Sequence, residues 1–232
     1  MIAYFPILFK RSFSIRRISI ILTLFIAVPI MKVIYLFYNS GLPIYKIEHF
    51  EKILMTNLFI PIIIPISTAI FIVSVVRKEM DTKTISYLFM VPHSRSLIPL
   101  TIVLITLILL TPIAVFTSLL AISGREISLD LQNLTRMGII SLATLFAYTS
   151  IWTVISLFFK RALIIVMIYI FVWEGTLSNL AGGIRKISVS FYATKIFTGF
   201  ASGHAGQEAF ILFVIGTVAL LLAIFKISRT EV

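Results

Sequence analysis

The amino-acid sequence predicts an all-α membrane protein with six transmembrane helices in a single domain, residues 1–232. Of the 232 residues, 59% are hydrophobic and only 12% are charged. A soluble domain has roughly 45–50% apolar and about 25% charged residues, so this chain has too few polar groups to cover a soluble surface. The apolar residues are also gathered into runs of about 20, the length that a helix needs to cross a bilayer.

Six segments have this length and composition, and some of them contain residues that are unusual inside a span. The first contains Pro29 and Lys32, the second contains Pro61 and Pro65, and the fifth contains Glu174. Neighbouring helices or water can satisfy the carbonyl groups that a proline leaves without a donor. We therefore predict spans at residues 18–38, 58–76, 97–122, 137–159, 162–180 and 209–227.

Lysine and arginine are distributed unequally between the two sides of this topology. More of them lie in the N-terminal segment, the loops after the second and fourth spans and the C-terminal tail than in the other three loops. Loops rich in these residues are retained in the cytosol, so we expect both termini to be cytoplasmic. The chain has no cysteine, which excludes disulfides and thiolate metal sites.

Two segments outside the spans have helical spacing of apolar residues. Within residues 1–17, the segment Tyr4–Phe13 has apolar residues at helical spacing (Phe5, Leu8, Phe9 and Phe13) with Lys10 and Arg11 beside them, as in a helix that lies at the cytoplasmic membrane surface. On the other side, apolar residues in 182–206 recur at helical spacing between glycines. We expect a short re-entrant or interfacial helix there, with an ordinary outer loop as the alternative.

Several motifs of enzymes and nucleotide-binding proteins are missing. No glycine is followed by lysine, so the phosphate-binding loop G-x-x-x-x-G-K-[ST] is absent. His49, His93 and His204 occur singly, so we expect no zinc site. Ser202 and His204 are only two residues apart, a spacing that does not easily align the serine and histidine of a hydrolase, and no orienting carboxylate is evident. A flexible Gly/Ser connection is the preferred interpretation. We expect no catalytic residue and no cofactor in this chain, and no nucleic acid among its partners.

The loop after the second span is the most informative segment outside the membrane. It begins with mixed charges, including Glu79 and Asp81, becomes apolar from Ile85, and its helical pattern ends at Pro92. Acidic residues in the first turn favour a helix. Its apolar side has two possible neighbours, namely the membrane surface or a groove on a cytosolic partner.

The order Glu79, Thr84, Leu88-Phe89, Pro92 and Ser94-Arg95 resembles the pattern of the permease subunits of type-2 ABC exporters, although Lys83 stands where that family usually has glycine. The six spans and cytoplasmic termini also resemble that family, which implies the plasma membrane of a prokaryote. The resemblance implies a coupling helix that docks on separate P-loop ATPase subunits, which bind the ATP and Mg. It also implies a second permease copy, in a homodimer or heterodimer. The implied coupling residues are Glu79, Asp81, Thr84, Ile85, Leu88, Phe89, Pro92 and Arg95.

Lys32 and Glu174 are the two charges inside the predicted spans. A charge at the bilayer centre costs about 2.5–3.5 kcal/mol on insertion scales, so it usually faces protein or water. Counting residues from the start of each span places both side chains at a similar depth. We hypothesise that they pair or line a common hydrated cavity. In the alternative, Lys32 extends outward to the interface and Glu174 lies near the outer surface.

Other functions are compatible with the same residues. An ion-coupled secondary transporter or channel would need no ATPase partner, but it predicts internal symmetry and more charges within the spans. An intramembrane hydrolase would depend on Ser202, and an accessory membrane scaffold would have no transport activity. The sequence does not indicate the transported substrate.

Overall fold

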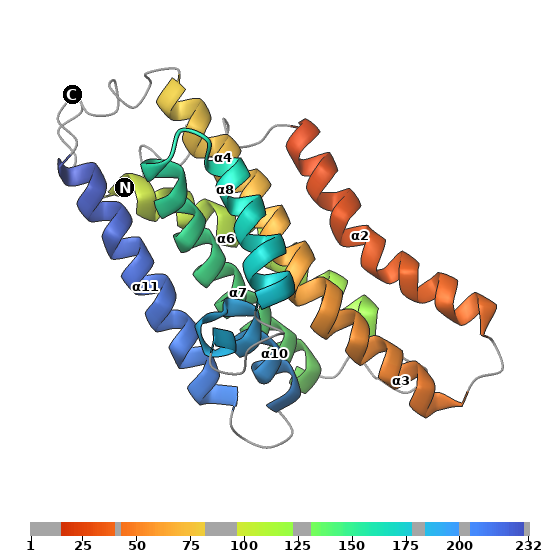
Figure 1. Ribbon diagram of the computed structural model, residues 1–232. Coiled ribbons are helices and arrows are strands. Elements are labelled where there is room, and N and C mark those ends of the chain that lie inside the picture. The colour runs from red at the N-terminus through yellow and green to blue at the C-terminus, as the bar shows by residue number, and fades with distance from the viewer. Residues whose placement is uncertain are drawn as a thin grey trace.

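The computed structural model describes residues 15–39, 43–81, 97–122, 131–177, 184–199 and 205–229. Regular structure within these ranges is entirely helical (Figure 1). Five of the helices are long and apolar enough to cross a membrane, namely Ile15–Tyr38, Tyr45–Arg77, Leu97–Ile122, Leu134–Phe158 and Ala205–Arg229. These helices confirm the prediction of an all-α, membrane-embedded protein.

Two stretches of π-helix lie within otherwise α-helical segments, and the helical backbone is continuous at each junction. The first, η1, joins α3 to α4, and the second, η2, extends α8. The elements are α2 (Ile15–Tyr38), α3 (Ile44–Ile53), η1 (Leu54–Ile63), α4 (Ile64–Asp81), α6 (Leu97–Ile122), α7 (Leu131–Phe158), α8 (Ala162–Ile168), η2 (Tyr169–Leu177), the 3₁₀-helix η3 (Ile184–Ile187), α10 (Val189–Gly199) and α11 (Ala205–Arg229).

The predicted spans agree with the helices to different degrees. The third, 97–122, has the same bounds as α6. The second was predicted to begin at residue 58, whereas the helix that contains it begins at Ile44. The fifth corresponds to a shorter apolar helix, Ala162–Thr176, which has fewer than the roughly 20 residues that a straight span needs. A sixth span therefore stays a prediction.

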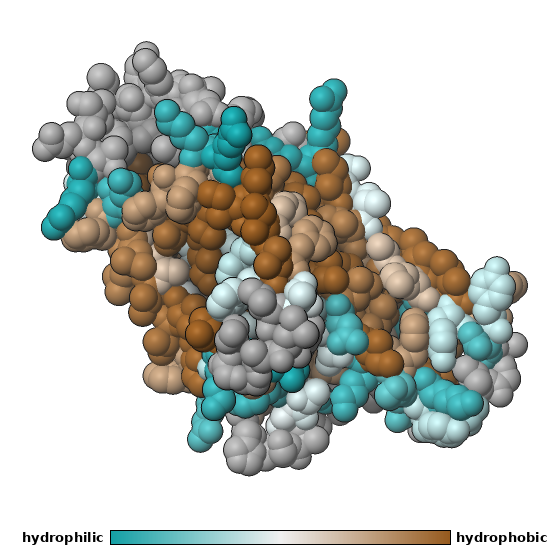
Figure 2. All heavy atoms as spheres, in the orientation of Figure 1, coloured by the Kyte–Doolittle hydropathy of each residue, from teal (hydrophilic) through white to brown (hydrophobic). Residues whose placement is uncertain are grey.

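The long helices run in alternate directions between two ends of the bundle (Figure 1). The start of α2 lies at the same end as the last turns of α4 and α11. The opposite end holds the start of α3, the end of η2, and η3 and α10; we call it the α10 end. Figure 2 shows a broad hydrophobic belt between these ends, with hydrophilic residues gathered at both of them. A belt of this kind is expected for a bundle whose helices cross a bilayer.

Helix α7 is the centre of the packing, because it contacts α4, α6, α8, α10 and α11. Trp152 in α7 is fully buried. Its indole N–H donates to the carbonyl of Pro65 at 3.2 Å and to the hydroxyl of Thr68 at 3.0 Å. Buried indoles generally need such a partner, and this pair of bonds fixes α7 against α4.

Helix α11 packs closely on α7 through small residues. Its buried face includes Ala209, Gly216 and Ala223. A Cβ added at Gly216 would lie 2.6 Å from the Phe146 ring and 3.3 Å from Cα of Ala147. Small residues at helix contacts within membranes allow this close approach, which is a major source of packing energy there.

Helix α2 touches the rest of the bundle along one narrow stripe. The buried members of this helix are Ile21, Phe25, Val28 and Lys32, which recur at intervals of three or four residues. Its other faces are apolar and exposed, including Phe37, which is 80% exposed. In a bilayer these faces contact lipid, so the attachment of α2 depends on the stripe that ends at Lys32.

Candidate functional site

The two π-helices contact each other and enclose a cavity together with η3 and α10. π-Helical segments are rare and are frequently found at functional sites. Pro61 lies inside η1 and has no N–H, so the carbonyl one turn earlier has no ladder donor. This break in the ladder falls beside Thr56 and Asn57, which both line the cavity.

The cavity has a volume of about 530 Å³, within the 300–1,000 Å³ range of small-molecule sites. Residues from all four elements line it, and polar side chains predominate. They are Thr56, Asn57, Pro61 and Ile62 of η1, Glu174 and Gly175 of η2, Arg185 of η3, and Ser190, Phe191, Thr194, Lys195 and Thr198 of α10.

Glu174 is 2% exposed and forms hydrogen bonds at the N-terminus of α10. One carboxylate oxygen accepts from the Tyr169 hydroxyl at 3.1 Å and from the backbone N–H of Val189 at 3.3 Å. The other accepts from the backbone N–H of Ser190 at 3.3 Å and from the hydroxyls of Ser188 and Ser190. The Ser188 hydroxyl also accepts from the N–H of Phe191 at 3.3 Å, as a helix N-cap does.

This arrangement provides Glu174 with a stabilising environment that requires no cation. The first N–H groups of a helix have no partner within the helix, and the helix dipole favours a negative charge beside them. Hydrogen bonds from five donor groups surround one carboxylate. Glu174 therefore joins η2 to α10 and forms part of the cavity wall.

Lys32 forms its salt bridge with Glu51 rather than with the predicted Glu174. The ammonium nitrogen lies 2.7 Å from a carboxylate oxygen, and the two side chains are 4% and 5% exposed. Lys32 also donates to the carbonyl of Leu120 in α6 at 3.3 Å. Beside the ion pair, the rings of Tyr35 and Phe50 stack with centroids 3.8 Å apart. These contacts join α2 to α3 and α6.

The predicted pairing was wrong because the sequence interpretation placed Glu51 in an outer loop. Helical structure in fact continues from Ile44 through Asp81, which carries Glu51 into the candidate span Tyr45–Arg77. The cavity described above is lined by Glu174 and not by Lys32, and a hydrated cavity common to both charges stays a prediction. Pro43 directly before the helix is a start signal that could have indicated this longer helix.

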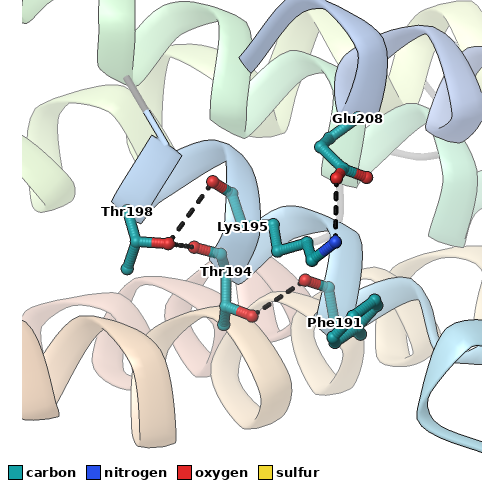
Figure 3. Close-up of polar contacts among 5 residues, drawn as sticks. All are labelled: Phe191, Thr194, Lys195, Thr198 and Glu208. Atoms are coloured by element: carbon teal, nitrogen blue, oxygen red, sulfur yellow. Dashed lines mark hydrogen bonds and ion pairs between the residues drawn. The ribbon is translucent and has the colours of Figure 1, made fainter. Parts of the chain in front are cut away.

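Two basic side chains of the cavity lie against the same aromatic ring. The guanidinium carbon of Arg185 is 5.2 Å from the centroid of Phe191, and the ammonium nitrogen of Lys195 is 4.7 Å from it. Lys195 also forms an ion pair with Glu208 of α11 at 3.0 Å (Figure 3). Cation–π contacts of this length are attractive, so the ring holds both cations at one wall of the cavity.

Most of the predicted coupling residues lie outside the described residues. Glu79 and Asp81 belong to the last turns of α4, not to the first turn of a separate helix as predicted, because α4 continues past the expected end of the second span to Asp81. Beyond the described ranges lie residues 1–14, which hold most of the predicted interfacial helix, and Ser202 and His204. Also outside the described residues are the other six predicted coupling residues, namely Thr84, Ile85, Leu88, Phe89, Pro92 and Arg95.

The predicted helical segment within 182–206 is present as η3 and α10, while its re-entrant or interfacial position stays a prediction. Across the ranges that the structure covers, no three histidine, aspartate or glutamate side chains are grouped so that they could hold a metal ion.

Comparisons with protein-family models, curated proteins and solved structures find no match to this chain. The fold and the site define a helical membrane protein with a polar cavity at the α10 end. A more specific function has to be inferred from the residues themselves.

Proposed function

We propose that this chain is the membrane-spanning permease subunit of an ATP-driven exporter of the type-2 ABC class. In this proposal six spans cross the plasma membrane of a prokaryote, with both termini in the cytosol. Two permease copies, identical or different, form the pathway, and separate P-loop ATPase subunits bind ATP and Mg. The observation that carries the proposal is the segment from Glu79 to Arg95, whose residue order resembles that of a coupling helix.

The course of the α3–η1–α4 helix supports this proposal. Its last turns contain Glu79 and Asp81 and lead directly into the proposed docking segment. Its middle part, η1, lines the cavity near the opposite end of the bundle. One continuous helix therefore connects the site where an ATPase would act with the polar cavity. A displacement of the docking segment would be transmitted along it.

Co-purification tests the partner directly. The full-length chain, extracted in a mild detergent from its own host, is expected to bring down a P-loop ATPase, and Leu88→Glu is expected to abolish that association. Ser86→Glu is the matched control, because helical spacing predicts that Ser86 lies away from the apolar side of Ile85, Leu88 and Phe89. Normal association of Leu88→Glu with the ATPase would contradict the docking role.

The alternative function is an ion-coupled secondary transporter or channel. The buried Lys32–Glu51 pair favours it, because charged residues inside a membrane often mark ion pathways. Flux through the purified chain in vesicles, driven by an ion gradient without ATP and without an ATPase, would establish the alternative and refute the exporter proposal.

A further inference from the structure

The charge that the cavity offers to a ligand is positive. Of its three charged side chains, Glu174 is buried and surrounded by donors from its own protein. Arg185 is exposed, and the side chain of Lys195 is 48% exposed. No carboxylate among the described residues forms a salt bridge with Arg185. The accessible part of the cavity therefore favours an anion.

The two cations are held in place before any ligand arrives. Arg185 and Lys195 both lie against the ring of Phe191, which limits the rotamers that each side chain explores. Preorganised groups lose less conformational entropy on binding. A guanidinium group also matches the planar spacing of phosphate or carboxylate oxygens, while an ammonium group acts as a point charge.

The rest of the lining indicates what the anion must carry. The Thr194 hydroxyl donates to the carbonyl of Phe191, and the Thr198 hydroxyl donates to the carbonyl of Thr194, both at 3.0 Å (Figure 3). Both hydroxyls therefore present lone pairs to a ligand, and a ligand with its own donors satisfies them. Pro61 and Ile62 add an apolar strip, which suits a molecule with an apolar part.

We propose that this cavity binds a phosphate ester that also carries hydroxyl or amine groups. Figure 2 shows hydrophilic groups gathered at the α10 end, where the hydrophobic belt stops. In a bilayer this is the level of the lipid headgroups, so phosphate esters are the anions present there at high concentration. A membrane phospholipid and a free polyol phosphate share this chemistry, and either could be the source.

The ion pair between Lys195 and Glu208 is the resting state of this site. Glu208 lies in the first turn of α11 and is not part of the cavity lining. A bound phosphate competes with Glu208 for the ammonium group of Lys195. Removing the charge of Glu208 therefore strengthens phosphate binding, whereas removing Lys195 or Arg185 weakens it.

Binding can be measured on the full-length chain in a maltoside detergent, without ATP or a partner subunit. Failure of this test is thus distinct from failure of the exporter proposal. The probes are a short-chain phosphatidylglycerol, followed by native mass spectrometry, and free glycerol phosphate, followed by calorimetry. The variants are Arg185→Gln, Lys195→Gln and Glu208→Gln, and Lys186→Gln is the matched control because Lys186 is exposed but does not line the cavity.

Each of Arg185→Gln and Lys195→Gln is expected to weaken binding about tenfold, the loss of one charge-assisted hydrogen bond. Glu208→Gln is expected to bind more tightly, and Lys186→Gln is expected to bind like the unaltered protein. Binding of the lipid alone identifies a headgroup site, and binding of glycerol phosphate identifies a site for the free ester. No binding of either probe, or equal losses in Lys186→Gln and Arg185→Gln, would overturn the proposal. If Lys195→Gln does not fold, Arg185→Gln and Glu208→Gln still test whether the cavity binds a phosphate ester.

Discussion

Removing one partner of the buried Lys32–Glu51 pair is expected to destabilise the protein strongly. At 2.7 Å, two unit charges attract by roughly 6 kcal/mol at an effective dielectric constant of about 20, before their desolvation is counted. Desolvation costs several kcal/mol for each ion. The pair as a whole therefore contributes little relative to apolar side chains, but one buried charge without its partner costs about 3–5 kcal/mol.

A double-mutant cycle separates these two effects. Lys32→Met and Glu51→Leu are each expected to lower the free energy of unfolding by about 3–5 kcal/mol, while the double variant is expected to lower it by less than about 2 kcal/mol. Glu48→Gln is the matched control, because Glu48 is exposed on the same helix three residues earlier. Unfolding can be followed in detergent by circular dichroism against denaturant.

Strictly additive losses in this cycle would refute the reasoning, since they would mean that the two charges do not interact. Hydrogen exchange provides an independent readout. Because the buried stripe of α2 ends at Lys32, either single variant is expected to increase exchange in α2 before the α7–α11 contact opens. Uniform exchange across the bundle would contradict the role of the pair as the attachment of α2.

Four further substitutions test the helix packing and the buried hydrogen bonds of the bundle. Gly216→Ala is expected to cost about 1–3 kcal/mol because its Cβ would overlap Phe146. Gly138→Ala has open space around it and is expected to stabilise α7 by up to about 1 kcal/mol. Equal melting temperatures of the two variants in detergent would contradict the role of Gly216 in close packing. Glu174→Gln is expected to cost about 1–3 kcal/mol because its amide N–H₂ faces other donors. Limited proteolysis is expected to cleave the variant faster at α10, and an unchanged cleavage rate would contradict this expectation. Trp152→Phe is expected to cost about 1–2 kcal/mol, since its ring packing is largely kept while both hydrogen bonds are lost. An unchanged melting temperature in Trp152→Phe, beside a large drop in Trp152→Ala, would show that packing and not hydrogen bonding matters there.

The sequence was sufficient for the helices whose apolar runs are uninterrupted. Residues 97–122 contain no charge, and the predicted and observed bounds coincide. It was insufficient for α3, where Lys46, Glu48 and Lys52 made a helical segment look like a loop between spans. Glu51 lies in that segment, so a hydropathy argument excluded the residue that pairs with Lys32.

The candidate site was only partly predictable for a different reason. Glu174 can be recognised in the sequence without reference to any other charged residue, because it is a charge inside an apolar run. Four of its five donors come from Ser188, Val189 and Ser190, beyond the end of its own helix. No helical spacing relates these positions, because they belong to different helical elements. Tertiary structure alone brings the carboxylate to the N-terminus of α10.

The position of η1 connects the two proposals physically. It contributes one wall of the cavity and, through α4, leads to the proposed docking segment. Pro61 within η1 and Pro65 just after it both remove ladder hydrogen bonds, so the helix is weakest where it lines the cavity. Bending of a helix concentrates where its ladder is interrupted. Motion that enters through the docking segment would therefore change the shape of the cavity more than it changes the packing of α4 against α7.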